Sequence, residues 1–184
     1  MNRTYHHGDL RAALVEAGLA LIEERAVEDF SLRELARRVG VSATAVYRHF
    51  PDKAALMSAL AGEGLAKLAM AQGAASARAG GGRAGFSATG VAYVHFAREN
   101  PGLFRMIFSH PAPQQCDDRM PDDATAMLRA GAAKVAKDGV DPAILALRAW
   151  SVVHGLAMLM LDRHISIDDA TIAAVVDVRS FGGR

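Results

Sequence analysis

The chain has a single cysteine, Cys116, among its 184 residues, and this scarcity excludes an internal disulfide. One lone cysteine is typical of proteins from a reducing cytoplasm. The chain also has no large excess of charge of either sign, since its net charge is only +1. It is therefore not a general polyanion binder, and any DNA affinity would need a local patch of basic residues. With 51% hydrophobic and 22% charged residues, the composition is that of a globular protein of one domain or two small ones.

Long hydrophobic runs are scarce as well. The most apolar run, Ala149–Leu161, is shorter than the roughly 20 residues that cross a bilayer, and it contains His154. The N-terminus is polar and rich in His and Gly, unlike a secretory signal. We therefore expect a soluble, cytoplasmic protein without a membrane partner.

Catalytic and metal-binding motifs are absent from the sequence. No HExxH, CxxC or GxSxG pattern occurs, and His110 and Cys116 share a segment without close further ligands. The triple glycine 80–82 has neither a strand before it nor a P-loop lysine after it. The scattered histidines, His95, His110, His154 and His164, are expected in structural or surface roles. We expect no enzymatic activity, no metal and no cofactor.

Residues 31–53, SLRELARRVGVSATAVYRHFPDK, form the stretch around which the chain is organised. Ser31 is a good N-cap, and Glu34 three residues later fits a capping box. Gly40 stands where a left-handed residue ends a helix, and Ser42 fits the N-cap of the next. The spacing predicts two short helices joined by a tight turn, with a third helix beginning at Lys53 behind its cap, Asp52.

Two such helices with a glycine turn are typical of a helix-turn-helix, although an ordinary helical hairpin is the alternative. In the second helix, Val46 and Phe50 share an inward face, which leaves Thr44 and Arg48 on the opposite one. The stretch also holds a local excess of basic residues, Arg33, Arg37, Arg38, Arg48 and Lys53, over the acidic Glu34 and Asp52. This excess favours DNA binding.

The runs VYRHFPDK and SLRELARRVG resemble the DNA-binding domain of the TetR (tetracycline-repressor) family of transcriptional regulators, and the opening YHHGDLR resembles one of its subgroups. The resemblance extends without gaps from Tyr5 to about Leu60. Together with the helix face, it implies base contacts from Thr44 and Ala45, and phosphate contacts from Tyr47, His49 and Lys53. The full set of expected DNA-binding residues is Arg33, Ser42, Thr44, Ala45, Tyr47, Arg48, His49 and Lys53.

The remaining periodicity predicts an all-α fold: a three-helix head over residues 1–52 with a flexible arm at 1–8, and a helical body over residues 53–184. The expected helices after the head begin at Asp52 (to about Ala77), Phe86 (to Arg98), Pro101 (to Phe108), Pro121, Asp141-Pro142, and Ser166 or Asp168. The helix from Pro142 is apolar nearly all round, more than one small subunit can cover. It predicts a homodimer held by the last two helices, which a charge at Leu156 would disrupt.

A second pattern, Trp150, His154 and Gly155 with the run NPGLFR at 100–105, resembles the C-terminal regulatory domain of the same subgroup. This resemblance implies dimerisation and a small-molecule pocket. The expected lining residues are Tyr93, Phe96, Phe104, Phe108, Met127, Trp150 and His154, which suit a small apolar or amphipathic effector. The partner of His154 stays open between a protein group, a water and the ligand.

These features predict a ligand-responsive repressor that binds a palindromic operator as a dimer, with ligand binding shifting the helix that follows the head. The alternative is a helical small-molecule-binding or scaffold protein without operator binding.

Overall fold

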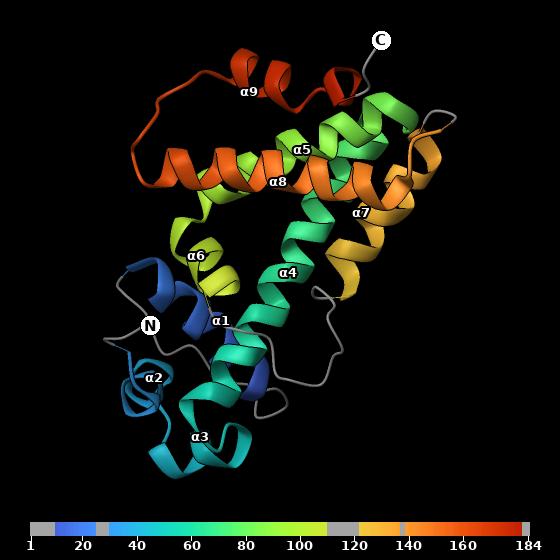
Figure 1. The fold of residues 1–184 in the computed structure, drawn as a ribbon. Coiled ribbons are helices and arrows are strands. Elements are labelled where there is room, and N and C mark those ends of the chain that lie inside the picture. The colour runs from blue at the N-terminus through green and yellow to red at the C-terminus, as the bar shows by residue number, and fades with distance from the viewer. Residues whose placement is uncertain (1–9, 25–29, 110–121, 137–138, 182–184) are drawn as a thin grey trace. The chain divides into compact units, whose positions relative to one another are not determined.

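The computed structural model describes residues 10–24, 30–109, 122–136 and 139–181, which form helices joined by short loops, with no strand among them. Figure 1 shows the order of the elements. The helices are α1 (Leu10–Glu24), α2 (Leu32–Val39), α3 (Ala43–His49), α4 (Lys53–Arg78), α5 (Gly82–Glu99), α6 (Pro101–Ser109), α7 (Asp122–Val135), α8 (Pro142–Leu161) and α9 (Asp169–Val176), followed by the short 3₁₀ helix η2 (Val178–Phe181). The all-α prediction is confirmed for this part of the chain.

Packing divides the chain into two units. The first unit comprises Met1–Gly64 and Gly102–Pro113, and the second comprises Leu65–Pro101 and Gln114–Arg184. The division falls inside α4 and assigns α6 to the first unit. The predicted boundary between residues 52 and 53 separates a DNA-binding domain from a regulatory domain by function. It stays a prediction, because packing does not test it.

The first unit is built around apolar side chains from α1, α2, α3 and the beginning of α4. The fully buried residues at its centre are Leu14, Leu21, Leu35, Val46, Phe50, Leu56 and Leu60. In the same unit, α6 lies close against α4 at Gly64, where a Cβ atom would come within 2.8 Å of Leu103 Cδ1 and 2.7 Å of Ile107 Cδ1. Gly64 therefore permits a close helix approach, while Gly62, two residues earlier, faces open space.

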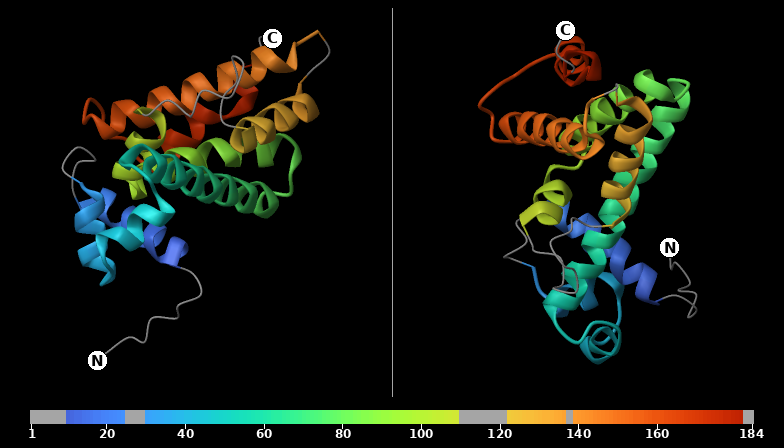
Figure 2. Two further views of the ribbon diagram at one scale, coloured as in Figure 1. Left: turned by 90° about the horizontal axis from the view of Figure 1, so that it is seen from below. Right: turned by 45° about the vertical axis from the view of Figure 1, so that its right-hand side comes forward.

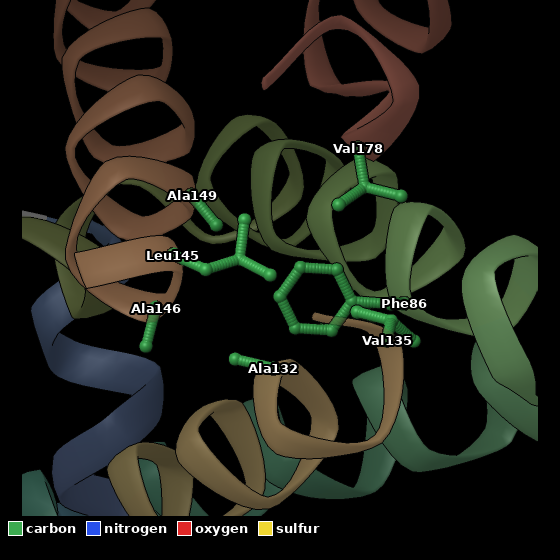
Figure 3. Packing of buried hydrophobic residues seen from close by; sticks show 7 residues of the cluster. All are labelled: Phe86, Ala132, Val135, Leu145, Ala146, Ala149 and Val178. Atoms are coloured by element: carbon green, nitrogen blue, oxygen red, sulfur yellow. The ribbon is translucent and has the colours of Figure 1, made fainter. Parts of the chain in front are cut away.

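The second unit is a bundle in which α5 contacts α7, α8 and α9, and both views of Figure 2 show α5 and α8 side by side. One end of its core is a cluster from α5, α7, α8 and η2, shown in Figure 3. The cluster consists of Phe86, Ala132, Val135, Leu145, Ala146, Ala149 and Val178. The Phe86 ring lies at its centre, with the small alanines of α7 and α8 leaving room for it.

Several helix starts follow their predicted caps. Asp52 accepts a hydrogen bond from the Ala55 amide at 2.7 Å, and Asp141 accepts one from Ala143 at 2.8 Å. Asp168 caps α9 through the Thr171 amide at 2.8 Å, which settles the choice between Ser166 and Asp168. Cap predictions succeed because they depend on residues only two or three positions apart.

One helix start and one short element differ from expectation. Helix α5 begins at Gly82, one turn before the predicted Phe86. It can begin this early because Gly80 and Gly81, both with positive φ, complete the turn after α4 in two residues. The 3₁₀ helix η2 was not predicted at all. The arm at residues 1–8 and the start of the helix at Pro121 lie outside the described residues.

By length and composition alone, α4 and α8 are long and apolar enough to cross a membrane. The length argument made for Ala149–Leu161 therefore fails, because the helix extends back to Pro142. Part of α8 is packed inside the second unit, at Leu145, Ala149 and Val153. One or two helices of this length and composition are weak evidence for a membrane protein.

Candidate nucleic-acid interface and regulatory site

The turn between α2 and α3 is set by local hydrogen bonds. Ser31 Oγ accepts from the Glu34 amide at 3.2 Å, and Gly40 adopts a left-handed φ of 77° at the end of α2. Ser42 Oγ then accepts from the Ala45 amide at 3.2 Å and starts α3. The predicted helix-turn-helix is therefore present, and Ser42 has a structural partner in addition to its expected role at DNA.

The two faces of α3 separate as predicted. Val46 and Phe50 are buried, whereas Thr44, Arg48 and His49 are exposed. Tyr47 is 46% exposed, which is unusual for a large aromatic ring and leaves its hydroxyl group accessible. On α2, Arg33 is exposed as well. This surface offers hydrogen-bonding and positively charged groups without a carboxylate on α3 itself.

Two cations lie over aromatic rings at the edge of this surface. Lys53 Nζ is 5.8 Å from the centre of the Phe30 ring, and the Arg11 guanidinium is 5.4 Å from that of Phe50. Such cation–π contacts hold long side chains in place while the charge remains near solvent. Arg11 was not among the predicted DNA-binding residues. The sequence gives no signal for the contact between Arg11 and Phe50, because the two residues are far apart in the chain.

In the second unit, Tyr93, Trp150 and His154 form a hydrogen-bonded cluster. Trp150 Nε1 donates to Tyr93 Oη at 3.4 Å, and the Tyr93 hydroxyl lies 2.9 Å from His154 Nδ1. The Trp150 and His154 rings are 5.6 Å apart, one helical turn from each other on α8. Sequence spacing predicted that pair. The structure adds Tyr93 from α5 as the protein group bonded to His154.

The protonation states in this cluster follow from burial. Burial raises the pKa of the Tyr93 hydroxyl well above its ordinary value, so Tyr93 keeps its proton. Burial also lowers the pKa of His154 below 6.5, which favours the neutral imidazole. The Tyr93 hydroxyl accepts from Trp150 and shares a second hydrogen bond with His154 Nδ1, in which the donor is set by the imidazole tautomer.

The other predicted pocket residues are distributed over three helices. Phe96 is buried on α5 and Met127 is half-buried on α7, both in the second unit. Phe104 and Phe108 lie on α6 in the first unit, with their rings 4.8 Å apart. The structure thus unites three of the seven predicted residues, and a pocket that includes the rest stays a prediction.

Metal-ligating side chains do not gather in the described part of the chain: no group of three His, Cys, Asp or Glu residues there could hold an ion. His110 and Cys116 lie outside the described residues.

Comparison with known proteins matches both parts of the chain. The family described as "Bacterial regulatory proteins, tetR family" matches residues 14–60, which include α2 and α3. The domain described as "Tetracyclin repressor-like, C-terminal domain" matches residues 86–178, from Phe86 to Val178. The chain belongs to the TetR family of transcriptional regulators. It is a DNA-binding, ligand-responsive regulator of transcription.

Solved structures share this TetR fold over nearly the whole chain. A protein of unknown function from Rhodococcus sp. RHA1 is 26% identical with a TM-score of 0.78, covering 98% of this chain and 97% of its own. A TetR family transcription regulator from Marinobacter aquaeolei VT8 is 20% identical with a TM-score of 0.64, covering 91% and 92%. TetR from Acinetobacter baumannii AYE is 19% identical with a TM-score of 0.60, covering 93% and 95%. Family members are generally non-enzymatic, soluble DNA-binding proteins.

Proposed function

We propose that this regulator is a cytoplasmic repressor that binds a palindromic operator as a homodimer and releases it when a small apolar or amphipathic effector binds the second unit. The observation that carries the proposal is the exposed face of α3, which holds polar and basic groups outward from a firmly buried Val46 and Phe50. A recognition helix needs a buried inner face that fixes its position and an exposed polar face that can contact DNA.

The roles proposed at the DNA follow from side-chain length and position. Thr44 and the small Ala45, in the first turn of α3, would lie against base edges in the major groove. Tyr47, His49 and Lys53 would contact phosphates, where hydroxyl and cationic groups fix the register of the protein. Arg33, on α2, is long enough to reach either. Arg48 would add a further phosphate contact.

Dimerisation is proposed through α8 and α9, because α8 leaves an apolar stripe at its surface. Ile144, Leu147 and Leu159 are 45%, 56% and 44% exposed at helical spacing. Ser151 and Gly155 lie between them, and a Cβ at Gly155 would meet no atom within 4 Å from other elements in the described part of the chain. On α9, Val175 is 40% exposed. Small residues flanked by large apolar ones are suited to close packing against the same helices of a second copy.

The effector site is proposed beside Tyr93, Trp150 and His154, because these residues supply hydrogen-bonding groups next to a largely apolar core. A pocket with few polar groups fixes a ligand's orientation through them. If His154 orients the ligand, His154→Phe would retain operator binding and lose the response to an effector found by screening. A normal response in this variant would assign His154 to the scaffold.

The proposal is tested by selecting duplexes from a random-sequence library with the full-length protein. We expect one enriched sequence with inverted symmetry, since a two-fold dimer presents two identical recognition helices. Enrichment without symmetry would contradict the dimeric mode, and absence of enrichment would contradict operator binding. The enriched sequence is called the operator duplex below.

A further inference from the structure

Arg11 carries a positive charge at a place in α1 that disfavours one. It precedes the buried Leu14 and Val15 by three and four residues, so it extends from the core-facing side of the helix. It also belongs to the first turn of α1, where the helix dipole favours negative charge and disfavours a cation. The side chain is nevertheless exposed, and its Cζ atom lies 5.4 Å from the centre of the Phe50 ring. A residue that departs from two local rules indicates a functional position.

The Phe50 ring places this charge at the carboxyl end of α3. Phe50 ends that helix, and its amide donates to the Val46 carbonyl at 2.9 Å. The ring is only 2% exposed, so it is held by the core of the first unit. Arg48 and His49, both exposed, directly precede Phe50 in the chain. Arg11 therefore joins the positively charged and imidazole groups at this end of α3, although it comes from another helix.

The contact with the ring leaves the hydrogen-bonding capacity of Arg11 unused. For comparison, Arg38 and Arg98 both donate to carboxylates. Within the described part of the chain, no hydrogen bond or ion pair engages Arg11. A ring attracts a guanidinium through its charge, whereas the five N–H donors of that group lie in its plane and point outward from its edge. Arg11 is therefore held in place while its donors remain available.

Lys53 is held in the same way. Its Nζ atom lies 5.8 Å from the centre of the Phe30 ring, which is 3% exposed. Lys53 is one of the residues proposed above to contact phosphates. Two cations of the first unit are thus each placed over a buried ring with their charge near solvent. This parallel supports the same use for Arg11.

We propose that Arg11 contacts a DNA phosphate and extends the DNA-binding surface from α3 to the start of α1. The flat guanidinium fits two oxygens of one phosphate, and its contact with Phe50 limits the conformations that it must lose on binding. Phosphate contacts fix the position of a protein on the duplex and carry no sequence information directly. Arg11 therefore contributes affinity, while base preference is set by other residues. This inference rests on the proposed function.

The experiment measures the affinity of the full-length protein for the operator duplex, and for a scrambled duplex of the same composition, at several salt concentrations. Arg11→Gln removes the charge and keeps most of the aliphatic stem beside Phe50. Arg11→Lys keeps the charge and loses the bidentate geometry. Arg78→Gln removes an exposed arginine from the end of α4, in the second unit, and is the matched control for the loss of one charge.

Arg11→Gln is expected to weaken binding to both duplexes about tenfold and to reduce the salt slope by about one unit, because one phosphate contact is lost. The ratio of the two affinities should stay unchanged. Arg11→Lys should retain the wild-type salt slope and recover part of the affinity, and Arg78→Gln should bind as the wild type does. All thermal midpoints should lie within a few degrees of the wild type, since the replaced side chains are exposed.

A wild-type salt slope in Arg11→Gln would overturn the inference and assign Arg11 to packing against Phe50. A reduced slope in Arg11→Lys, which keeps the charge, would contradict it as well. An equal reduction in Arg78→Gln would do the same, because the effect would then follow net charge.

The proposed function can fail separately from this inference. A wild-type protein that binds both duplexes alike would refute operator recognition, and the salt slopes would still decide the role of Arg11, because phosphate contacts act on any sequence. A wild-type protein that binds neither duplex would refute both.

Discussion

The Tyr93 hydroxyl group is hydrogen-bonded to both Trp150 and His154. Tyr93 therefore links the other two members of the aromatic cluster in the second unit. The oxygen accepts from Trp150, and the same hydroxyl group is hydrogen-bonded to His154 Nδ1. The pair on α8 was predictable, since residues four apart share a helix face. The link to Tyr93 was not, because the two residues are 61 positions apart in sequence.

The neutral state of His154 predicts a pH dependence of stability. Its folded pKa is lowered from 6.5, so the unfolded chain binds a proton more readily than the folded one. Stability is therefore lost as the pH falls from about 6.5 towards the folded pKa. Urea denaturation of the wild type and His154→Phe between pH 5 and 8, the range in which histidine titrates, should show a steeper acid loss in the wild type. Parallel curves would contradict the assignment.

Substitutions at the proposed DNA-contacting residues should have two different kinds of effect on binding. Lys53→Ala should weaken binding about equally on all duplexes and reduce the salt slope by about one unit, because one phosphate contact is lost. Thr44→Ala should change which bases are preferred and leave the salt slope alone. Fluorescence anisotropy on the operator duplex and single-base variants measures both effects. A Thr44 variant with unchanged affinity and preference would show that another face reads the bases.

At the scale of helices, most helix starts could be predicted from local signals, whereas contacts between distant parts of the chain could not. Caps at Ser31, Ser42 and Asp52 were predictable because each capping bond spans three residues. The grouping of α6 with the head was not predicted, since it depends on the hydrogen bond that Glu23 accepts from the Gly102 amide, 79 positions away. A glutamate at a helix end resembles an ordinary solvated surface, and no pattern in one sequence distinguishes it.

Replacing each of the two glycines in the middle of α4 by alanine should change the stability of the protein in opposite directions. Gly62→Ala should stabilise the protein by about 1 kcal/mol, because the helix gains a better former at an open site. Gly64→Ala should destabilise it by about 1 kcal/mol, because the new methyl group overpacks the buried Leu103 and Ile107. Urea denaturation gives both values. Equal stabilisation by the two substitutions would contradict the close approach of α6.

At the scale of the whole molecule, the exposed apolar stripe of α8 supports the proposed dimer, but Leu156, the residue chosen from sequence to test it, is a poor probe. Leu156 is only 8% exposed within a single chain, so a charge there would disrupt the chain's own core. Helical periodicity could not reveal this, because α8 is apolar on both its inner and its outer face.

Leu147 is the better probe of the dimer, since it is 56% exposed and packs against little of its own chain. Leu147→Glu should give a folded monomer, because dimerisation would bury an unpaired charge. Met70→Glu, at a position 75% exposed on α4, is the matched control and should remain dimeric. Sedimentation at micromolar concentration distinguishes the two. A wild-type monomer under these conditions would contradict the proposed assembly.

The central claim is that two α3 helices, held by one dimer, read a specific DNA sequence. It is tested most directly by titrating labelled operator duplex, and a scrambled duplex of the same composition, with the wild-type protein at one fixed salt concentration. We expect two chains per operator duplex and an affinity at least about a thousandfold above that for the scrambled duplex. Equal affinity for the two duplexes would contradict the claim.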